Sequence, residues 1–199
     1  MTEHTGAITI TNNDYTLTQL VTINNASIGA ITLSTTNVAL SGSSTNLASA
    51  LDGTINSTGA VTVTNNDYTV AQLKTINAGT SGTITLNTTN VLLSGDSTDI
   101  AAAFAGTVTE HTGAITITNN DYTVAELKTI NAETTGAITL NTTNVALSGD
   151  STDIVAAFAG TVTEHTGQIT VTNNDYTVCL LYTSPSPRDQ RGSRMPSSA

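Results

Sequence analysis

The feature that most constrains this chain is a sequence repeat. The hexapeptide TNNDYT occurs four times, and its aspartate stands at Asp14, Asp67, Asp121 and Asp175, which gives spacings of 53, 54 and 54 residues. A fixed period of about 20–50 residues is typical of stacked repeat architectures, in which each repeat contacts only its neighbours. The 199-residue chain is therefore expected to be an array of similar units.

Each unit divides into a short and a long half. Both halves open with the pattern G-x-I/V-T, which alternates polar and apolar side chains as a β-strand does. A turn rich in Asn, Ser and Asp follows, and then a short run with helical spacing. The long half inserts a further strand-like piece, NVALSGD at Asn144–Asp150. The openings lie 23 and 30 or 31 residues apart, at Gly6, Gly29, Gly59, Gly82, Gly113, Gly136 and Gly167.

The short halves carry helix-start signals known as capping boxes. A Thr side chain accepts a backbone N–H three residues on, and a Glu or Gln side chain there reaches back to the N–H of the Thr. Val124, Leu127 and Ile130 recur at helical spacing and predict one apolar face. In the long halves, a helix is predicted over Asp99–Gly106, where the glycine ends it. The boxes are Thr16 with Gln19, Thr69 with Gln72, and Thr123 with Glu126.

A strand with one or two helical turns cannot bury its own apolar face, so neighbouring halves must share a core. The prediction is an α/β solenoid in which seven strand–short-helix coils stack in a parallel sheet with right-handed winding. An all-β solenoid, in which the helix-like runs form corners, is the alternative. The array is expected to cover residues 1–178, with units at about 6–58, 59–112 and 113–166 and a partial unit at 167–178.

Residues 179–199 differ from everything before them. They contain all three prolines, the single cysteine and three of the five Lys and Arg residues of the chain. The repeat also breaks inside an expected helix, because Leu180 stands where the capping box opened by Thr177 needs Glu or Gln. The stretches CLLYTSPSPRD and RMPSSA resemble reading frames of a sequencing adapter. We therefore expect this tail to be a non-native, disordered artefact that carries no function.

The first residues raise a similar question. Met1 occupies the place that Val108 and Val162 hold in the stretch GTVTEHTG. We expect residues 1–178 to be an internal part of a longer array, whose true ends and number of units this sequence does not fix.

Composition argues against several classes of partner. The net charge is −10 at pH 7, and Lys74 and Lys128 are the only Lys or Arg residues before the tail. Such a surface repels phosphates, so neither nucleic acid nor an anionic membrane face is an expected partner. No apolar run approaches the ~18 residues of a membrane span, and the start lacks the basic and apolar parts of a signal peptide. Without cysteine before residue 179, disulfide and thiol chemistry are not expected.

Three histidines, His4, His111 and His165, occur in the motif TEHTG. A metal site would need its ligands preserved from unit to unit, together with partners. The corresponding stretch Thr54–Gly59 has neither Glu nor His. The histidines are therefore predicted to lie on an exposed loop.

Paired aspartates in the motif SGDSTD suggest calcium as a ligand. The first unit has SGSSTN instead, with Ser43 and Asn46 at the two positions. Ser, Asn and Asp replace one another as helix caps but not as calcium-binding carboxylates, so helix capping is favoured and weak calcium binding is the alternative. The aspartates of TNNDYT are expected to form turns or caps. The calcium candidates are Asp96, Asp99, Asp150 and Asp153.

The tyrosines of TNNDYT are expected to stack as a structural ladder, with a sugar-binding aromatic platform as the alternative. They are Tyr15, Tyr68, Tyr122 and Tyr176. Thr-x-Thr pairs such as Thr116/Thr118 are expected to face away from the isoleucines, and ranks of this kind are similar to those of ice-binding solenoids. Because the pairs fall only in alternate coils, ordinary strand propensity explains them better.

No nucleophile–His–acid set, paired-carboxylate motif or phosphate-binding loop stands out, so we expect neither an enzyme nor a cofactor, weak calcium binding aside. The stretches GAITITNNDYTVAELKTINAETTGAITL and VALSGDSTDIVAAFAGTV resemble tandem arrays in very large secreted or cell-surface, adhesin-type proteins of bacteria, including marine cyanobacteria. The resemblance implies an extracellular or cell-surface stalk, spacer or surface-layer segment. Its implied partners are neighbouring repeats, cell-surface polysaccharide or other cells. A calcium-stiffened binding module and an ice-binding solenoid are the alternatives.

Overall fold

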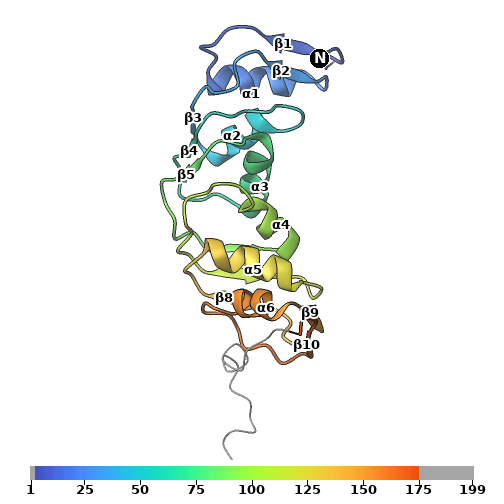
Figure 1. Cartoon of the computed structure of the whole chain (residues 1–199). Helices are drawn as coiled ribbons and strands as arrows, with labels where there is room; N and C mark the ends of the chain where they lie inside the picture. Colours follow the sequence, from blue (N-terminus) through green and yellow to red (C-terminus); the bar gives the residue numbers. More distant parts are fainter. Residues whose placement is uncertain (1–2, 175–199) are drawn as a thin grey trace, which may run out of the picture.

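The computed structural model describes residues 3–174 of the chain. Short strands and short helices alternate along this part, and Figure 1 shows them following one another in chain order along an elongated body. The helices are α1 (Leu17–Ala26), α2 (Ser44–Leu51), α3 (Val70–Gly79), α4 (Ser97–Ala103), α5 (Val124–Glu133) and α6 (Ser151–Ala157). The strands are β1 (Ile8–Ile10), β2 (Ile31–Leu33), β3 (Leu40–Gly42), β4 (Val61–Val63), β5 (Ile84–Leu86), β6 (Leu93–Gly95), β7 (Ile115–Ile117), β8 (Ile138–Leu140), β9 (Leu147–Gly149) and β10 (Ile169–Val171).

The strands form small parallel sheets rather than the one continuous sheet predicted from the sequence. Within residues 3–174 the sheets are β1–β2, β3–β4–β5, β6–β7–β8 and β9–β10, and none of them closes on itself. In the pairing of β6 with β7, Leu93 is opposite Ile115 and Ser94 is opposite Thr116. Alternation along a strand therefore sends the apolar side chains inward and the hydroxyl side chains outward.

The division into sheets follows from the two strands of each long half. In the half that opens at Gly82, β5 pairs back to β4, whereas β6 pairs forward to β7. One long half therefore contributes to one sheet with its first strand and starts the next sheet with its second. The inserted strand predicted in NVALSGD is present as β9, and its equivalents in the other long halves are β3 and β6.

The helices pack against one another in chain order, from α1 against α2 to α5 against α6. The predicted alternation of parallel strands with short helices is therefore confirmed. The all-β alternative is wrong, because helices of 7–10 residues occupy the places where it put corners. The helix predicted over Asp99–Gly106 is α4, which begins and ends earlier than expected, at Ser97 and Ala103.

One contiguous apolar core runs through the described part of the chain. Val61 and Ile84, opposite each other in neighbouring strands, are fully buried, and so are Leu73 of α3 and Leu127 of α5. Burying such a side chain contributes about 1.5–3 kcal/mol, so stacking supplies the apolar contacts that a single half lacks.

The partial unit 167–178 is described as far as residue 174. Its strand β10 pairs in parallel with β9, as β4 does with β3 and β7 with β6. Tyr176 and the adapter-like tail Cys179–Ala199 lie outside the described residues, as does Met1.

Candidate functional site

The first asparagine of TNNDYT joins consecutive halves of the array. Asn119 Oδ1 accepts a hydrogen bond from the Ser97 backbone N–H (2.8 Å), and Asn119 Nδ2 donates to Ser97 Oγ (2.9 Å) and to Asp121 Oδ1 (2.7 Å). The asparagine thus binds the first residue of α4, where backbone N–H groups lack partners within the helix. The same double contact joins Asn65 to Ser44 and Asn173 to Ser151.

The capping residue Glu126 extends this junction. Its carboxylate accepts hydrogen bonds from the Thr123 N–H (2.9 Å), Thr98 Oγ1 (2.7 Å) and Ser97 Oγ (3.0 Å). Burial acts to raise the pKa of Glu126, but the hydrogen bonds together outweigh it, and the pKa is lowered. One side chain therefore caps its own helix α5 and holds the start of α4.

All three capping boxes have the geometry that their pattern implies. At the starts of α1, α3 and α5, the Thr side chain accepts the N–H of the third helical residue, and the Gln or Glu side chain there accepts the N–H of the Thr. The Thr residues are Thr16, Thr69 and Thr123, and their partners are Gln19, Gln72 and Glu126.

The tyrosines of TNNDYT lie in the interior. Tyr15, Tyr68 and Tyr122 are buried, and their hydroxyls donate to the carbonyls of Thr35, Thr88 and Thr142 at 2.6–2.8 Å. Tyrosines of this motif occur only in alternate halves, so another half lies between successive tyrosines. The rings of Tyr68 and Tyr122 contact the rings of His111 and His165. Burial raises the pKa of Tyr68 to about 12.

The prediction of exposed histidines is wrong for His111. Its side chain has no solvent exposure, its Nδ1 lies 3.4 Å from Tyr68 Oη, and its ring centroid lies 5.7 Å from that of Phe104. His165 is half-buried and contacts the equivalent residues of the next unit, Tyr122 and Phe158. His4 is exposed, as predicted.

A paired change in the sequence could have indicated this burial. In the first unit, Leu51 stands where later units have Phe104 and Phe158, and Ser57 stands where they have His111 and His165. The large aromatic residue and the histidine therefore occur together and are lost together. Residues that change as a pair in this way are in contact here, at the end of each long half.

Burial lowers the pKa of His111 and of His165, because it removes the charged imidazolium from water. The backbone carbonyls of Val91 and Val145 act in the opposite direction, since each favours a protonated ring. Nε2 of both histidines is buried without a hydrogen-bond partner.

The four calcium candidates have different partners. Asp99 and Asp153 form exposed ion pairs with Lys74 and Lys128, both at 2.5 Å. Asp96 accepts a hydrogen bond from Thr118 Oγ1 (3.1 Å), and Asp150 caps α6 by accepting the Thr152 N–H (3.0 Å). Within residues 3–174, no group of three or more His, Cys, Asp or Glu residues is placed to hold a metal ion. The first unit carries Val21 and Asn46 in place of Lys and Asp, which is another paired change.

The outer face of the sheets carries a row of hydroxyl side chains. Ser41, Thr62 and Thr85 are adjacent in the sheet β3–β4–β5, and the equivalent row in β6–β7–β8 is Ser94, Thr116 and Thr139. No second row of hydroxyls runs beside it in the sheet β6–β7–β8, because the neighbours of Thr118 there are Asp96, to which it donates a hydrogen bond, and Asn141, whose side-chain amide donates to the Thr118 carbonyl. The flat double rank considered for ice binding is thus interrupted.

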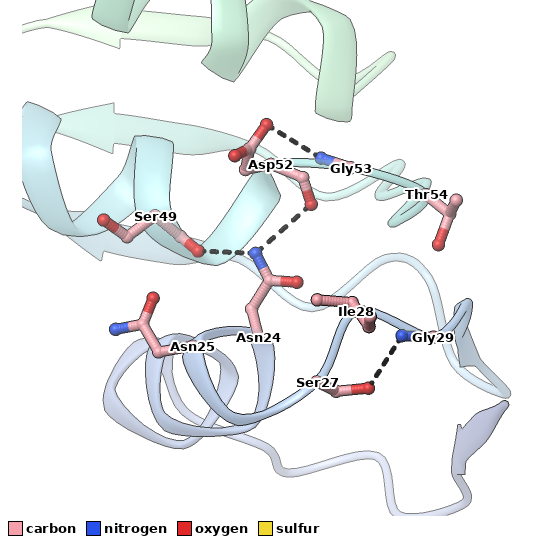
Figure 2. A pocket seen from close by; sticks show the side chains of 9 residues that line it. All are labelled: Asn24, Asn25, Ser27, Ile28, Gly29, Ser49, Asp52, Gly53 and Thr54. Atoms are coloured by element: carbon pink, nitrogen blue, oxygen red, sulfur yellow. Dashed lines mark hydrogen bonds between the residues drawn. The ribbon is translucent and has the colours of Figure 1, made fainter. Parts of the chain in front are cut away.

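A pocket of about 330 Å³ lies between the C-terminal ends of α1 and α2 (Figure 2). Asn24, which lines the pocket, donates from Nδ2 to the carbonyls of Ser49 (2.8 Å) and Asp52 (3.2 Å). Asp52 Oδ1 accepts a hydrogen bond from the Gly53 N–H (2.9 Å). Asn77 and Asn131 make the matching contacts to Ala102 and Ala156 in the later units. The asparagine side chain therefore donates to carbonyl groups at the C-terminal end of the neighbouring helix. The pocket has the polar lining of a helix terminus.

Among the residues that the structure describes, no helix has the length and apolar character needed to cross a bilayer. The hydrogen bonds of Asn119 and Glu126 join one half of the array to the next.

Comparisons of the chain with protein-family models, with curated proteins and with solved structures give no match.

Proposed function

We propose that this chain is a non-catalytic structural segment of an extracellular or cell-surface bacterial protein, in which it acts as a stalk, spacer or surface-layer element. In this proposal the small sheets and stacked helices are part of a right-handed α/β solenoid of 23- and 30/31-residue coils. The same arrangement continues into the partial unit that opens at Gly167, where β10 pairs with β9.

The main support is the repetition of one junction along the chain. The double contact between Asn and Ser recurs at Asn65–Ser44, Asn119–Ser97 and Asn173–Ser151, with the same atoms at each place. A junction that recurs unchanged lets length grow by whole units without new contacts. The other conspicuous side chains, including the aspartates that were candidates for calcium, are engaged in contacts within or between units.

A length series tests the structural part of this proposal. Chains carrying two, three, four and five copies of residues 113–166 should show a maximum dimension, by small-angle X-ray scattering, that increases by a constant step per copy. Their free energy of unfolding should also rise with each added copy. A maximum dimension that grows only as the cube root of length would show separate or globular packing and overturn the solenoid.

Binding and environment need separate measurements. A stalk or spacer predicts that the midpoint of thermal unfolding shifts little with millimolar calcium or with chelator, and that no thermal hysteresis appears. A large calcium-dependent rise would favour the calcium-stiffened module, and hysteresis would favour the ice-binding solenoid. Beads coated with the chain test adhesion, since capture of bacterial cells or surface polysaccharide would add a binding role to the stalk.

A further inference from the structure

The two aromatic–histidine clusters have a property that the stalk proposal does not use. One consists of Tyr68, Phe104 and His111, and the other of Tyr122, Phe158 and His165; we call each a Tyr–His latch. We propose that protonation of the histidine opens the latch, so that the end of each long half is released from the core in acid.

The contacts of His111 within the described residues include no carboxylate that would offset a positive charge. The Tyr68 hydroxyl donates its single proton to the Thr88 carbonyl (2.7 Å), so its oxygen can only accept from His111 Nδ1 (3.4 Å). The opposite nitrogen, Nε2, is buried without a hydrogen-bond partner. The Phe104 ring, which is itself 1 % exposed, also lies against the imidazole. A second proton would thus place a full charge in an apolar site.

The charged groups on the packed elements do not offset that charge by direct contact. Glu110 precedes the histidine, and Glu133 at the end of α5 supplies only a backbone carbonyl, which accepts the His111 N–H (2.9 Å). Burial, and to a smaller extent repulsion from the Glu110 carboxylate, raises the pKa of Glu133. Lys74 and Asp99 on α3 and α4 form an exposed pair with each other. The acceptor that faces the ring is the Val91 carbonyl, which opposes opening but does not reverse the effect of burial.

The segment that the latch holds is attached to the core by separate hydrogen bonds rather than by a strand ladder, and the N–H groups of Thr109, His111 and Thr112 donate to the carbonyls of Ile84, Glu133 and Thr89. Residues 105–112 contain no strand, and they join the sheets through isolated bridges, Ile84 to Val108 and His111 to Thr134. A segment without a continuous strand ladder opens at lower cost than a central strand does. Loss of the buried ring is therefore expected to release this segment before the whole chain unfolds.

The direction of the pH effect follows from the lowered pKa of His111 and His165. The neutral ring is favoured in the closed state, so the latch is fully closed above the ordinary histidine pKa of about 6.5 and opens as pH falls below it. Each latch takes up one proton. Its opening constant can therefore rise by at most about tenfold per unit of pH.

The first unit is a matched control within the same molecule. Ser57 forms the same parallel bridge, to Thr80, that His111 forms to Thr134. Ser57 and Leu51 replace the histidine and the phenylalanine, so this segment has the same architecture without an imidazole. It should be indifferent to protons in the range where the latches open.

Hydrogen exchange of the full chain, followed by mass spectrometry at about pH 7.5 and about pH 5.5 and corrected for the intrinsic rate, tests the proposal. We expect a loss of protection of up to about tenfold in residues 105–112 and 159–166, and no comparable change in residues 52–57. Equal loss in all three segments, or no loss in the first two, would overturn it.

A variant adds an independent check. The double substitution Phe104→Leu with His111→Ser installs the pair of the first unit and should abolish the acid response of residues 105–112, while residues 159–166 still respond. If that variant does not fold, the imidazole titrations of the unaltered chain decide by NMR. The pKa of His111 should then lie below the ordinary histidine value of about 6.5, and a pKa at or above that value would refute the latch.

Discussion

Asn119 binds Ser97 through both polar atoms of its side-chain amide: Oδ1 accepts a hydrogen bond from the Ser97 backbone N–H, and Nδ2 donates one to Ser97 Oγ. The two residues are 22 positions apart and belong to different halves of the array. Because this contact recurs along the chain, it accounts for the first Asn of the repeated TNNDYT better than local turn formation does.

Substitution of Asn119 should weaken the array at this junction. We expect Asn119→Ala to lower the free energy of unfolding by about 1–3 kcal/mol, because it leaves buried polar groups of Ser97 unsatisfied. Urea denaturation followed by circular dichroism measures the change. The control is Asn120→Ala at the exposed next position, where a change within about 0.5 kcal/mol is expected. Equal losses for the two variants would show that the contact with Ser97 contributes nothing.

Removal of a helix cap gives a second prediction. Thr123→Ala should cost about 1 kcal/mol, because the side-chain oxygen that accepts the Glu126 N–H is lost. The exposed Thr135 is the matched control, since Thr135→Ala changes the same residue type without removing a cap. The two midpoints of thermal unfolding should differ by a few degrees, and coincident midpoints would contradict the role assigned to Thr123.

Gly136, which opens a half, differs sharply in its surroundings from Gly95, which ends β6. A Cβ at Gly136 would overlap the carbonyl group of Gly113 in the neighbouring half, and backbone atoms cannot move aside cheaply. Gly136→Ala should therefore destabilise the chain by about 3 kcal/mol or more.

Gly95 provides the comparison for that variant. A Cβ there would meet the Val70 side chain at 3.6 Å, an ordinary van der Waals distance. Gly95→Ala should be tolerated within about 1 kcal/mol in the same denaturation experiment. A larger effect at Gly95 than at Gly136 would show that close approach of the backbones is not what requires glycine.

Alkaline pH should act through Tyr68. Its pKa is raised to about 12 by burial, so the neutral phenol is favoured in the folded state. The stability that this provides is complete below the ordinary tyrosine pKa of about 10 and is lost as pH rises towards 12. Ultraviolet absorbance should show Tyr68 ionising late or together with unfolding. Ionisation of every tyrosine near pH 10 in a chain that remains folded would be the contrary result.

The ion pair Lys128–Asp153 should matter little. Both side chains are more than 40 % exposed, so water and salt screen the attraction between them. We expect Lys128→Ala to change the free energy of unfolding by less than about 1 kcal/mol, and less still in high salt. A salt-insensitive loss of several kcal/mol would mean that the pair is protected from solvent in a larger assembly.

Local patterns predicted the elements well, because the information lies within a few residues. The capping boxes at Thr16, Thr69 and Thr123 mark real helix starts, and the alternation after Gly113 marks a real strand. The inserted strand β9 was also visible in NVALSGD. Each of these signals depends on spacing along the chain alone.

Two errors arose where the outcome depends on another half of the array. Apolar alternation does not specify which neighbour a strand joins, so the separate partners of β5 and β6 could not be derived from it. The burial of His111 depends on Phe104 of the same half and Tyr68 of the preceding one. Only the paired replacement by Leu51 and Ser57 carried that information, and it needs a comparison between units.

The sharing of each long half between two sheets sets the step in which such an array can evolve. Duplication or deletion of a full 53- or 54-residue period leaves β5 beside β4 and β6 beside β7. Removal of a single half would leave β5 or β6 without its partner strand. The unpaired backbone amide groups of that strand would then be exposed to other chains. Recombination between gene copies is therefore expected to retain only changes by whole periods, and length variants should differ by multiples of one period.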